Sequence, residues 1–325
     1  MQTLRSEHIL IAICILVIMS SLDESYKRQN SQDERQANIF SFRILTFNRP
    51  ESLERLFQSL SNIRMKGNYK SVNLHIYVDS TNKEYQSQRE LNNIVRVREA
   101  TQRFQWPFGK KEIHYRTVHH GLRKQWLGAW YPTNEVEASG FLEDDIEISC
   151  RFLEYVEKIL SAMNSSKRDS IDEFVHCGGI VMEELKISQH LLTTVINQQS
   201  LNCFRVRFTS SWGPIYFGTF WKHFMDWYLT TTLKPNFTPY TETSDDKYNL
   251  WLRQGKDVWS PWLKRFLDET DYWFIYCKPP RKNTVWLRNH VDIGTNTQSY
   301  QRSSLPELFS GDLSSYNIPC FKYCK

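Results

Sequence analysis

The feature that most constrains the fold is an alternation of strand and helix patterns along residues 41–150. Segments rich in β-branched and aromatic residues predict strands, and the segments between them predict helices. The predicted strands are Ser41 to Phe47, Val72 to Val78, Ile113 to Val118 and Gly140 to Leu142. The first predicted helix begins at Asn48–Pro50, with Asn48 as its cap. Two further helices are predicted over Ser87 to Arg103 and Leu122 to Trp130. This alternation is typical of an α/β fold with a mostly parallel central sheet and helices on both faces.

The pattern after Cys150 is less regular. Helices are predicted at Phe152 to Met163, at Phe220 to Tyr228 and from Trp262 to Leu267, and strands at Ser211 to Phe217 and Ile275–Tyr276. The Trp residues of this half, such as Trp259 and Trp262, either stack on sugar faces or belong to the core. Both readings stay open at the level of sequence.

Polar side chains follow three of the predicted strands. Arg49 follows the first strand, Asp79 the second, and the triplet Glu143-Asp144-Asp145 the fourth. The carboxyl ends of parallel strands meet at one edge of a sheet, where ligands bind. Adjacent carboxylates suit Mg²⁺ or Mn²⁺, which can bridge the protein and a substrate diphosphate. The sequence therefore predicts a divalent-cation site here, and a solvated acidic turn is the alternative.

The charge balance argues against one class of function. The 325 residues contain 41 Lys and Arg and 36 Asp and Glu, a net charge of +5 without a run of five like charges. A nucleic-acid-binding protein usually carries a basic stripe, so we expect no nucleic-acid partner. The hydrophobic content of 40%, with 14% aromatic residues, excludes disorder for most of the chain.

The N-terminus predicts entry into the secretory pathway. An apolar run from Ile9 to Met19 follows Arg5 and precedes a polar stretch. We interpret residues 1–22 as a short apolar helix that is a signal anchor or a cleaved signal peptide, and residues 23–39 as a polar stem. A buried core helix is the third alternative. The anchor predicts a single-pass type II protein of the Golgi or ER membrane with residues 40–325 in the lumen, and the signal peptide predicts a secreted protein.

Two other features agree with that compartment. Sequons for N-glycosylation start at Asn164 and Asn236. Six cysteines remain outside the apolar run, namely Cys150, Cys177, Cys203, Cys277, Cys320 and Cys324. In an oxidising compartment they predict up to three disulfides, whose pairing the sequence leaves open.

The segment Phe141 to Ser149 (FLEDDIEIS), continued by Phe152 to Tyr155, resembles inverting GT-A glycosyltransferases of the secretory pathway. The group it resembles is that of N-acetylglucosaminyltransferase I, which includes the O-mannose β-1,2-N-acetylglucosaminyltransferase. Ile44 to Pro50 and Val78 to Ser80 share the resemblance, which covers roughly Phe42 to Leu160 and, more loosely, Ser211 to Gly213. It implies a GT-A fold with a nucleotide-sugar half at residues 40–150 and an acceptor half at 151–325.

The resemblance also implies roles for single residues. Arg49 would contact the diphosphate of a UDP-sugar, and Asp79 would accept a hydrogen bond from the uracil N3–H. Asp145 would be the direct Mn²⁺ ligand, while Glu143 and Asp144 would contact ribose and sugar hydroxyls. The alternatives are a surface arginine at 49 and a strand-end turn at Asp79.

The resemblance implies metal-dependent transfer of a sugar, such as N-acetylglucosamine, from a UDP-sugar to a glycan or glycoprotein hydroxyl with inversion. An inverting transfer needs a carboxylate that removes the acceptor proton. Asp246 matches that role best, Asp245 second, and Asp257 is a third candidate. His290 is a candidate metal or diphosphate ligand, or else a structural histidine. The competing functions are a non-catalytic carbohydrate-binding protein that keeps the GT-A fold, and a nucleotidyltransferase.

Overall fold

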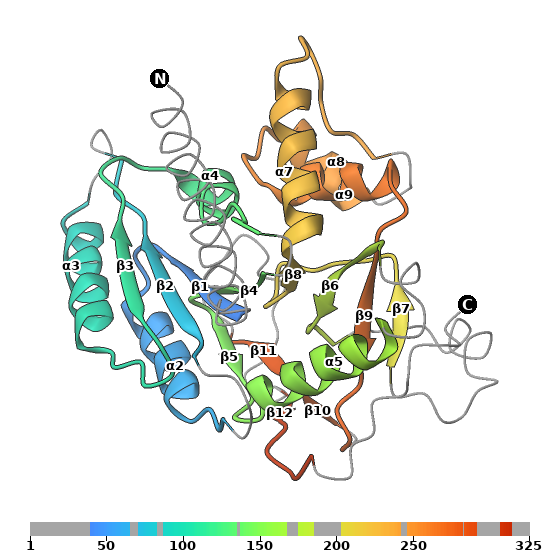
Figure 1. The fold of residues 1–325 in the computed structure, drawn as a ribbon. Helices are drawn as coiled ribbons and strands as arrows, with labels where there is room; N and C mark the ends of the chain where they lie inside the picture. The colour runs from blue at the N-terminus through green and yellow to red at the C-terminus, as the bar shows by residue number, and fades with distance from the viewer. Residues whose placement is uncertain are drawn as a thin grey trace, which may run out of the picture. The chain divides into compact units, whose positions relative to one another are not determined.

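The structure is a computed structural model, shown as a ribbon in Figure 1. It describes residues 40–65, 71–82, 87–134, 137–167, 175–184, 203–241, 246–281, 283–290 and 306–313. These residues belong to one compact unit that begins at Ile39. The predicted apolar helix, the anchor or signal peptide and the stem all lie outside the described residues. Within the described ranges, every helix is too short or too polar to cross a bilayer.

An eight-stranded sheet forms the centre of this unit, with the order β3-β2-β1-β4-β8-β6-β9-β7. Its strands are β1 (Phe40–Thr46), β2 (Asn73–Val78), β3 (Lys111–Tyr115), β4 (Ala138–Glu143), β6 (Cys177–Val181), β7 (Cys203–Val206), β8 (Ile215–Phe217) and β9 (Trp273–Cys277). The strands β3, β2, β1 and β4 are all parallel, which confirms the prediction for the first half of the chain. The second half is mixed, because β8 is antiparallel to β4 and β6, and β7 is antiparallel to β9. Apolar patterns identify strands but do not encode their direction, so this half was predicted less well.

The described helices are α2 (Pro50–Ser61), α3 (Gln88–Arg103), α4 (Gly121–Leu127), α5 (Phe152–Lys167), α7 (Gly218–Thr232), α8 (Asp246–Arg253) and α9 (Ser260–Asp268). Two small sheets pair β5 (Ile146–Ile148) with β11 (Leu287–Asn289) and β10 (Thr284–Val285) with β12 (Glu307–Leu308). The sequence did not predict α8, β6, β7 or these short strands. The predicted cap of α2 is also corrected: the cap residue is Arg49 rather than Asn48, and its side chain makes no capping hydrogen bond.

Helices cover both faces of the sheet because side chains alternate along each strand. On β1, Phe42 and Ile44 join a buried cluster with α2, α3 and α5, whereas Leu45 joins a second cluster with α4, α7 and α9. Figure 1 shows α2 and α3 beside β1 to β3, and α7 with α9 beside β8. The predicted α/β architecture with two covered faces is confirmed.

Aromatic rings fill the second face. Trp126 is fully buried and stacks on Trp259 and Phe141, with ring centroids 4.0 and 5.0 Å apart. Trp259 and Trp262 are 2% and 8% exposed. Both therefore belong to the core, which decides between the two readings left open by the sequence.

A disulfide between Cys203 and Cys277 joins the neighbouring strands β7 and β9. The six cysteines outside the apolar run could form up to three disulfides, and this bond is one of them. Cys320 and Cys324 lie outside the described residues. The sequon residue Asn236 is exposed in the segment after α7.

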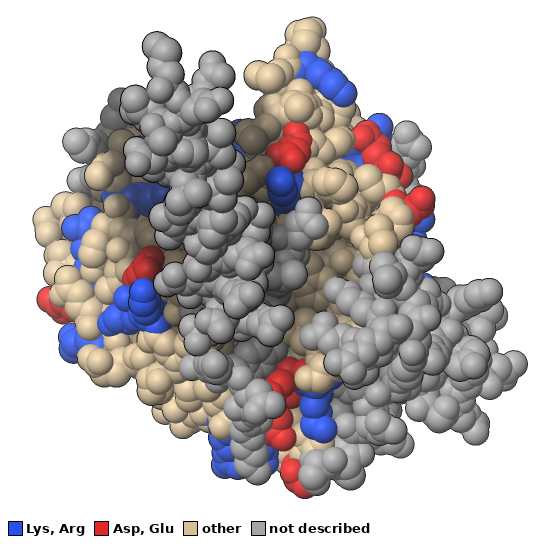
Figure 2. Space-filling view, viewed as in Figure 1, with Lys and Arg blue, Asp and Glu red and all other residues tan. Residues whose placement is uncertain are grey.

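Charges of both signs lie side by side on the surface. Figure 2 shows Lys and Arg among Asp and Glu on the described part of the face in view. Surface ion pairs such as Arg96–Glu51 and Arg281–Glu307 are part of this mixture.

Replacing Gly213 by Ala is expected to destabilise the protein by about 2–4 kcal/mol. Gly213 has φ +58°, and a Cβ there would overlap with Leu287 Cδ2 in β11. Gly255 is the matched control, because it has φ +67° and open space around its Cβ position. Gly255→Ala should lower the free energy of unfolding by only about 1 kcal/mol, because a non-glycine residue is strained at a positive φ. Urea melts measure both, and equal losses would contradict a contact with Leu287.

Candidate active site

The polar residues at the strand ends meet at one edge of the sheet, as predicted. β1 lies between β2 and β4, with Thr46 opposite Val78 and Leu45 opposite Glu143. The loops that follow these three strands therefore start side by side. They carry Arg49, Asp79 and the acidic turn Glu143–Asp145.

Arg49 bridges two carboxylates of the acidic turn. Its Nη1 donates to Asp145 Oδ2 at 3.1 Å, and its Nη2 donates to Asp144 Oδ1. Burial opposes a charged guanidinium, but the carboxylates of Asp144, Asp145 and Glu143 outweigh it and raise the pKa of Arg49. The resemblance implied a diphosphate contact, whereas here both arms of the guanidinium bind the protein's own carboxylates.

Asp144 is the most deeply held of the three carboxylates. It is 1% exposed and accepts a hydrogen bond from Thr46 Oγ1 at 2.8 Å, in addition to Arg49. Burial raises the pKa of Asp144 in spite of these two donors. Asp144 is thereby fixed from β1 and from the start of α2.

Glu143 points toward α4, where Trp126 Nε1 donates to its Oε1 at 3.1 Å. Burial and then the neighbouring carboxylate of Asp145 raise the pKa of Glu143 to about 8. Arg49 thus contacts two of the three carboxyl groups, whereas Glu143 contacts Trp126. The turn has more acidic groups than Arg49 can neutralise.

Asp145 Oδ1 is a carboxylate oxygen of the turn that receives no hydrogen bond from the described residues. The atom is buried, and no hydrogen-bond donor among the described residues contacts it. A buried acceptor without a donor is costly, unless a ligand satisfies it. Together with the excess of carboxylates, this oxygen fits Mg²⁺ or Mn²⁺, which prefer hard oxygen ligands.

Asp79 has partners other than the one that the resemblance implies. It is 3% exposed, and its Oδ1 accepts the backbone N–H groups of Ser80 and His120, both at 2.9 Å. Its Oδ2 accepts the N–H of Gly121 at 2.9 Å and lies 3.2 Å from His119 Nδ1. Both oxygens of the carboxylate therefore accept hydrogen bonds from the protein, and these bonds anchor the start of α4. Asp79 thus lies in a strand-end turn, and its contact with uracil stays a prediction.

His290 is buried beside the acidic turn but faces other groups. Its backbone N–H donates to the Asp145 carbonyl at 2.8 Å. Its Nε2 lies 2.8 Å from Ser52 Oγ, and its Nδ1 lies 3.3 Å from Glu147 Oε1. The ring thus lies between Ser52 and Glu147, and a metal-binding role for His290 stays a prediction.

Replacing Glu147 by Gln is expected to lower stability at pH 7 by about 2 kcal/mol. The hydrogen bond with His290, opposed by burial and aided by Arg288, lowers the pKa of Glu147 from 4.5 to about 2. The carboxylate therefore stabilises the fold above about pH 5, and this contribution disappears as the pH falls from 5 to 2. Denaturant melts of both proteins should converge over that interval.

Glu307→Gln is the control for this prediction. Glu307 pairs with Arg281 at the surface, where both side chains are more than half exposed. Exposed pairs contribute little, so this variant should stay within about 0.5 kcal/mol of wild type at every pH. A gap for Glu147→Gln that is constant with pH would contradict the proposed role of its carboxylate.

The candidate bases lie at the limit of the described chain. Asp245 lies outside the described residues. Asp246 is the first residue of α8, and the structure describes its backbone but not its side chain. Thr241 precedes these two aspartates in the sequence and Asn249 follows them. The Thr241 N–H donates to Asn249 Oδ1 at 3.0 Å. The third candidate, Asp257, is exposed and pairs with Arg123 Nε at 2.6 Å.

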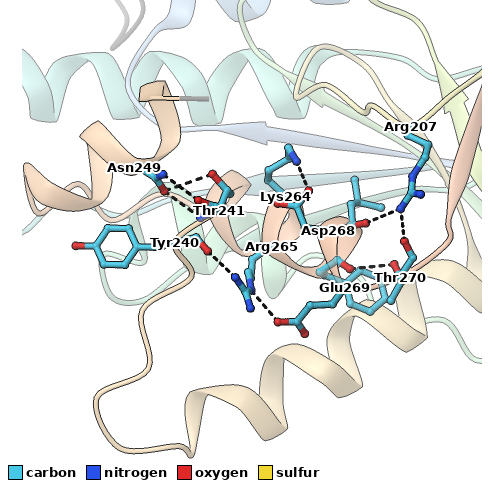
Figure 3. A network of polar contacts seen from close by, with 11 residues as sticks. Arg207, Tyr240, Thr241, Asn249, Lys264, Arg265, Asp268, Glu269 and Thr270 are labelled. Carbon is cyan, nitrogen blue, oxygen red and sulfur yellow. Dashed lines mark hydrogen bonds and ion pairs between the residues drawn. The ribbon is translucent and has the colours of Figure 1, made fainter. Parts of the chain in front are cut away.

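Figure 3 shows how this region is held to the rest of the fold. Arg265 Nη1 donates to the Tyr240 carbonyl at 3.0 Å, and its Nε contacts Glu269 Oε1 at 2.7 Å. Arg207 Nη2 donates to the Thr270 carbonyl at 2.6 Å, at the end of α9. The chain just before the candidate bases is therefore anchored on α9.

Sequence reasoning missed two residues of the site. Thr46 is the last residue of β1, and its position before Arg49 could have placed it beside the acidic turn. Trp126 contacts Glu143 from α4, the helix that precedes β4 in the sequence, and no local signal predicts such a contact.

No protein-family model matches the chain, and no curated protein matches it. Several solved structures are similar to it. "Crystal structure of S. aureus TarS" has a TM-score of 0.35 and 15% identity, over 57% of this chain and 29% of that one. The mannosyltransferase PcManGT from Pyrobaculum calidifontis, in complex with GDP-Man and Mn²⁺, has a TM-score of 0.34 and 10% identity, over 55% and 44%.

Mouse xyloside xylosyltransferase 1 has a TM-score of 0.30 and 11% identity, over 74% of this chain and 98% of that one. The chain matches less than half the length of the first two structures. The two neighbours whose names state an activity are glycosyltransferases. At this level of similarity the matches carry no information about the reaction or substrate of this chain.

Proposed function

We propose that the acidic turn binds Mn²⁺ or Mg²⁺ and that the protein is a metal-dependent GT-A glycosyltransferase with a UDP-sugar as donor. The observation that carries the proposal is the buried Asp145 Oδ1, which has no donor among the described residues. It lies in a group of three carboxyl groups, two of which contact Arg49, at the edge of the sheet where ligands bind.

Each residue of the turn would have a defined part in this site. Asp145 would hold the cation through Oδ1, and Thr46 and Arg49 keep Asp144 and Asp145 in place. Trp126 orients Glu143 toward ribose or sugar hydroxyls. A bound divalent cation would neutralise charge that develops on the departing nucleoside diphosphate.

The transfer we propose is a single displacement with inversion. The acceptor oxygen forms a bond to the anomeric carbon while the bond from that carbon to the diphosphate oxygen breaks. The hydroxyl proton goes to a carboxylate, for which Asp246 is the first candidate and Asp245 the second. Following the resemblance to the N-acetylglucosaminyltransferase I group, we propose N-acetylglucosamine as the sugar and a glycan or glycoprotein as acceptor.

The location and the division of the chain are further parts of the proposal. We place residues 40–325 in the lumen of the Golgi or ER, behind an anchor at 1–22 and a stem at 23–39, with secretion as the alternative. The disulfide between β7 and β9 supports an oxidising compartment. Within this domain we assign nucleotide-sugar binding to residues 40–150 and acceptor binding to 151–325.

One observation favours a second candidate function. Arg49 already binds two carboxylates of the turn, and its positive charge partly balances them without a cation. A carbohydrate-binding protein that keeps the fold but performs no transfer would need no cation at all. The two candidates differ in whether a UDP-sugar is consumed.

Incubation of the full-length protein with UDP-N-acetylglucosamine and Mn²⁺ tests the choice. We expect slow release of UDP by hydrolysis, faster release with a glycan acceptor, and none in the presence of EDTA. Release that is insensitive to EDTA would overturn the metal dependence. An inactive but folded protein that binds glycans without UDP would favour the carbohydrate-binding alternative.

A further inference from the structure

A second group of ligand-type side chains lies on strands β2 and β3. The two strands are parallel, with His75 opposite Glu112 and Tyr77 opposite His114. Residues two apart on a strand share a face, so His75, Glu112 and His114 all point to the same side of the sheet. β3 is the edge strand. This group does not include any residue of the acidic turn.

The ligand atoms of the three side chains converge on one point. His75 Nδ1 lies 3.3 Å from His114 Nε2 and 3.4 Å from Glu112 Oε2. The third separation, from His114 Nε2 to Glu112 Oε2, is 3.9 Å. Zn²⁺ binds imidazole nitrogen and carboxylate oxygen at about 2.0–2.1 Å, so two ligands of a tetrahedral site lie about 3.3–3.4 Å apart. Two separations already match, and the third needs a shift of roughly half an ångström.

The surrounding contacts hold the two imidazoles in orientation. The Tyr77 ring stacks on His114 with centroids 4.4 Å apart and an interplanar angle of 10°. The His75 and His114 rings are nearly parallel, at 18°. The three side chains are 19%, 51% and 37% exposed for His75, Glu112 and His114. An ion can therefore enter from solvent, and water can fill a fourth position.

A hydrogen bond between the imidazoles accounts for only part of this arrangement. One ring nitrogen can donate to the other, but that bond does not explain why the Glu112 carboxylate faces both nitrogens. A cation explains all three separations at once. Arg43 is opposite His75 on β1 and adds a positive charge on the same face of the sheet, so the Glu112 carboxylate is the ligand that offsets this charge.

We propose that His75, Glu112 and His114 bind one Zn²⁺, with water as the fourth ligand. This is the ligand count of an open zinc site. Since the ligands come from two neighbouring strands, the ion fastens the edge strand β3 to β2. Among the described residues, this is the only cluster of three His, Cys, Asp or Glu side chains with such geometry.

The test is titration of metal-free full-length protein with ZnCl₂ in competition with a chelating dye at pH 7.5. We expect one tight site and a rise in Tm of about 4 °C or more on adding Zn²⁺. Glu112→Gln and His114→Ala should each weaken binding about 100-fold. His223→Gln is the matched control, because His223 is exposed and contacts Tyr272 instead of this group.

Two further results decide between this site and the acidic turn. Asp145→Asn should leave the Zn²⁺ affinity unchanged, and the zinc X-ray absorption spectrum should show two imidazoles in the first shell. The proposal fails if folded wild-type protein leaves all Zn²⁺ with the dye. It also fails if Glu112→Gln and His114→Ala bind Zn²⁺ as wild type does, or if Asp145→Asn alone abolishes binding.

Discussion

Asp145→Asn is expected to weaken Mn²⁺-dependent binding of UDP at least about 100-fold. Asn has the same size and keeps one oxygen, but it removes the negative charge and can turn an amide toward the ligand. The buried Oδ1 is the acceptor without a donor, so the loss falls on the proposed ligand atom. Isothermal titration of full-length protein with UDP, with and without Mn²⁺, measures the change.

Two variants make this result specific. Asp226→Asn removes an exposed carboxylate on α7 and should bind UDP as wild type does. Arg49→Ala removes the guanidinium from two carboxylates and should tighten the binding of Mn²⁺ alone. If folded Asp145→Asn binds UDP with Mn²⁺ normally, the acidic turn is not the cation site. If wild type binds no UDP at all, the UDP-sugar proposal fails.

Trp126→Ala is expected to destabilise the protein by about 3–5 kcal/mol. The indole is fully buried, stacks on Trp259 and Phe141, and donates to Glu143. Truncation leaves a cavity between α4 and the sheet and also removes a hydrogen bond from a buried carboxyl group. Urea melts followed by circular dichroism measure the loss, and a folded variant should also show weaker Mn²⁺ binding.

Trp126→Phe separates packing from hydrogen bonding. Most of the ring stacking stays, so the loss should fall to about 1–2 kcal/mol. Without the indole N–H the pKa of Glu143 should rise further above its ordinary value. Leu233→Ala is the control, since Leu233 is 83% exposed and should change stability by less than about 0.5 kcal/mol. Equal losses for the Phe and Ala variants would contradict a packing role.

Local patterns were sufficient to predict the first half of the sheet. Apolar and β-branched runs predicted β1 to β4, and the position of Arg49, Asp79 and the acidic triplet after three of these strands predicted their common edge. This worked because parallel strands connected by helices must bring their carboxyl ends to the same side. The short strands of the second half have no such repeating pattern, and their direction depends on partners far away in the chain.

The sequence alone determined which polar residues meet at the sheet edge, but the tertiary structure decided which of them touch. Arg49 binds carboxylates 95 and 96 residues further along the chain, and Asp79 accepts backbone N–H groups at the start of α4. His290 contacts Ser52, and His75 meets His114 across two strands. Hydrogen bonds and ion pairs act over about 3 Å, so they depend on strand register and side-chain direction, which no local pattern encodes.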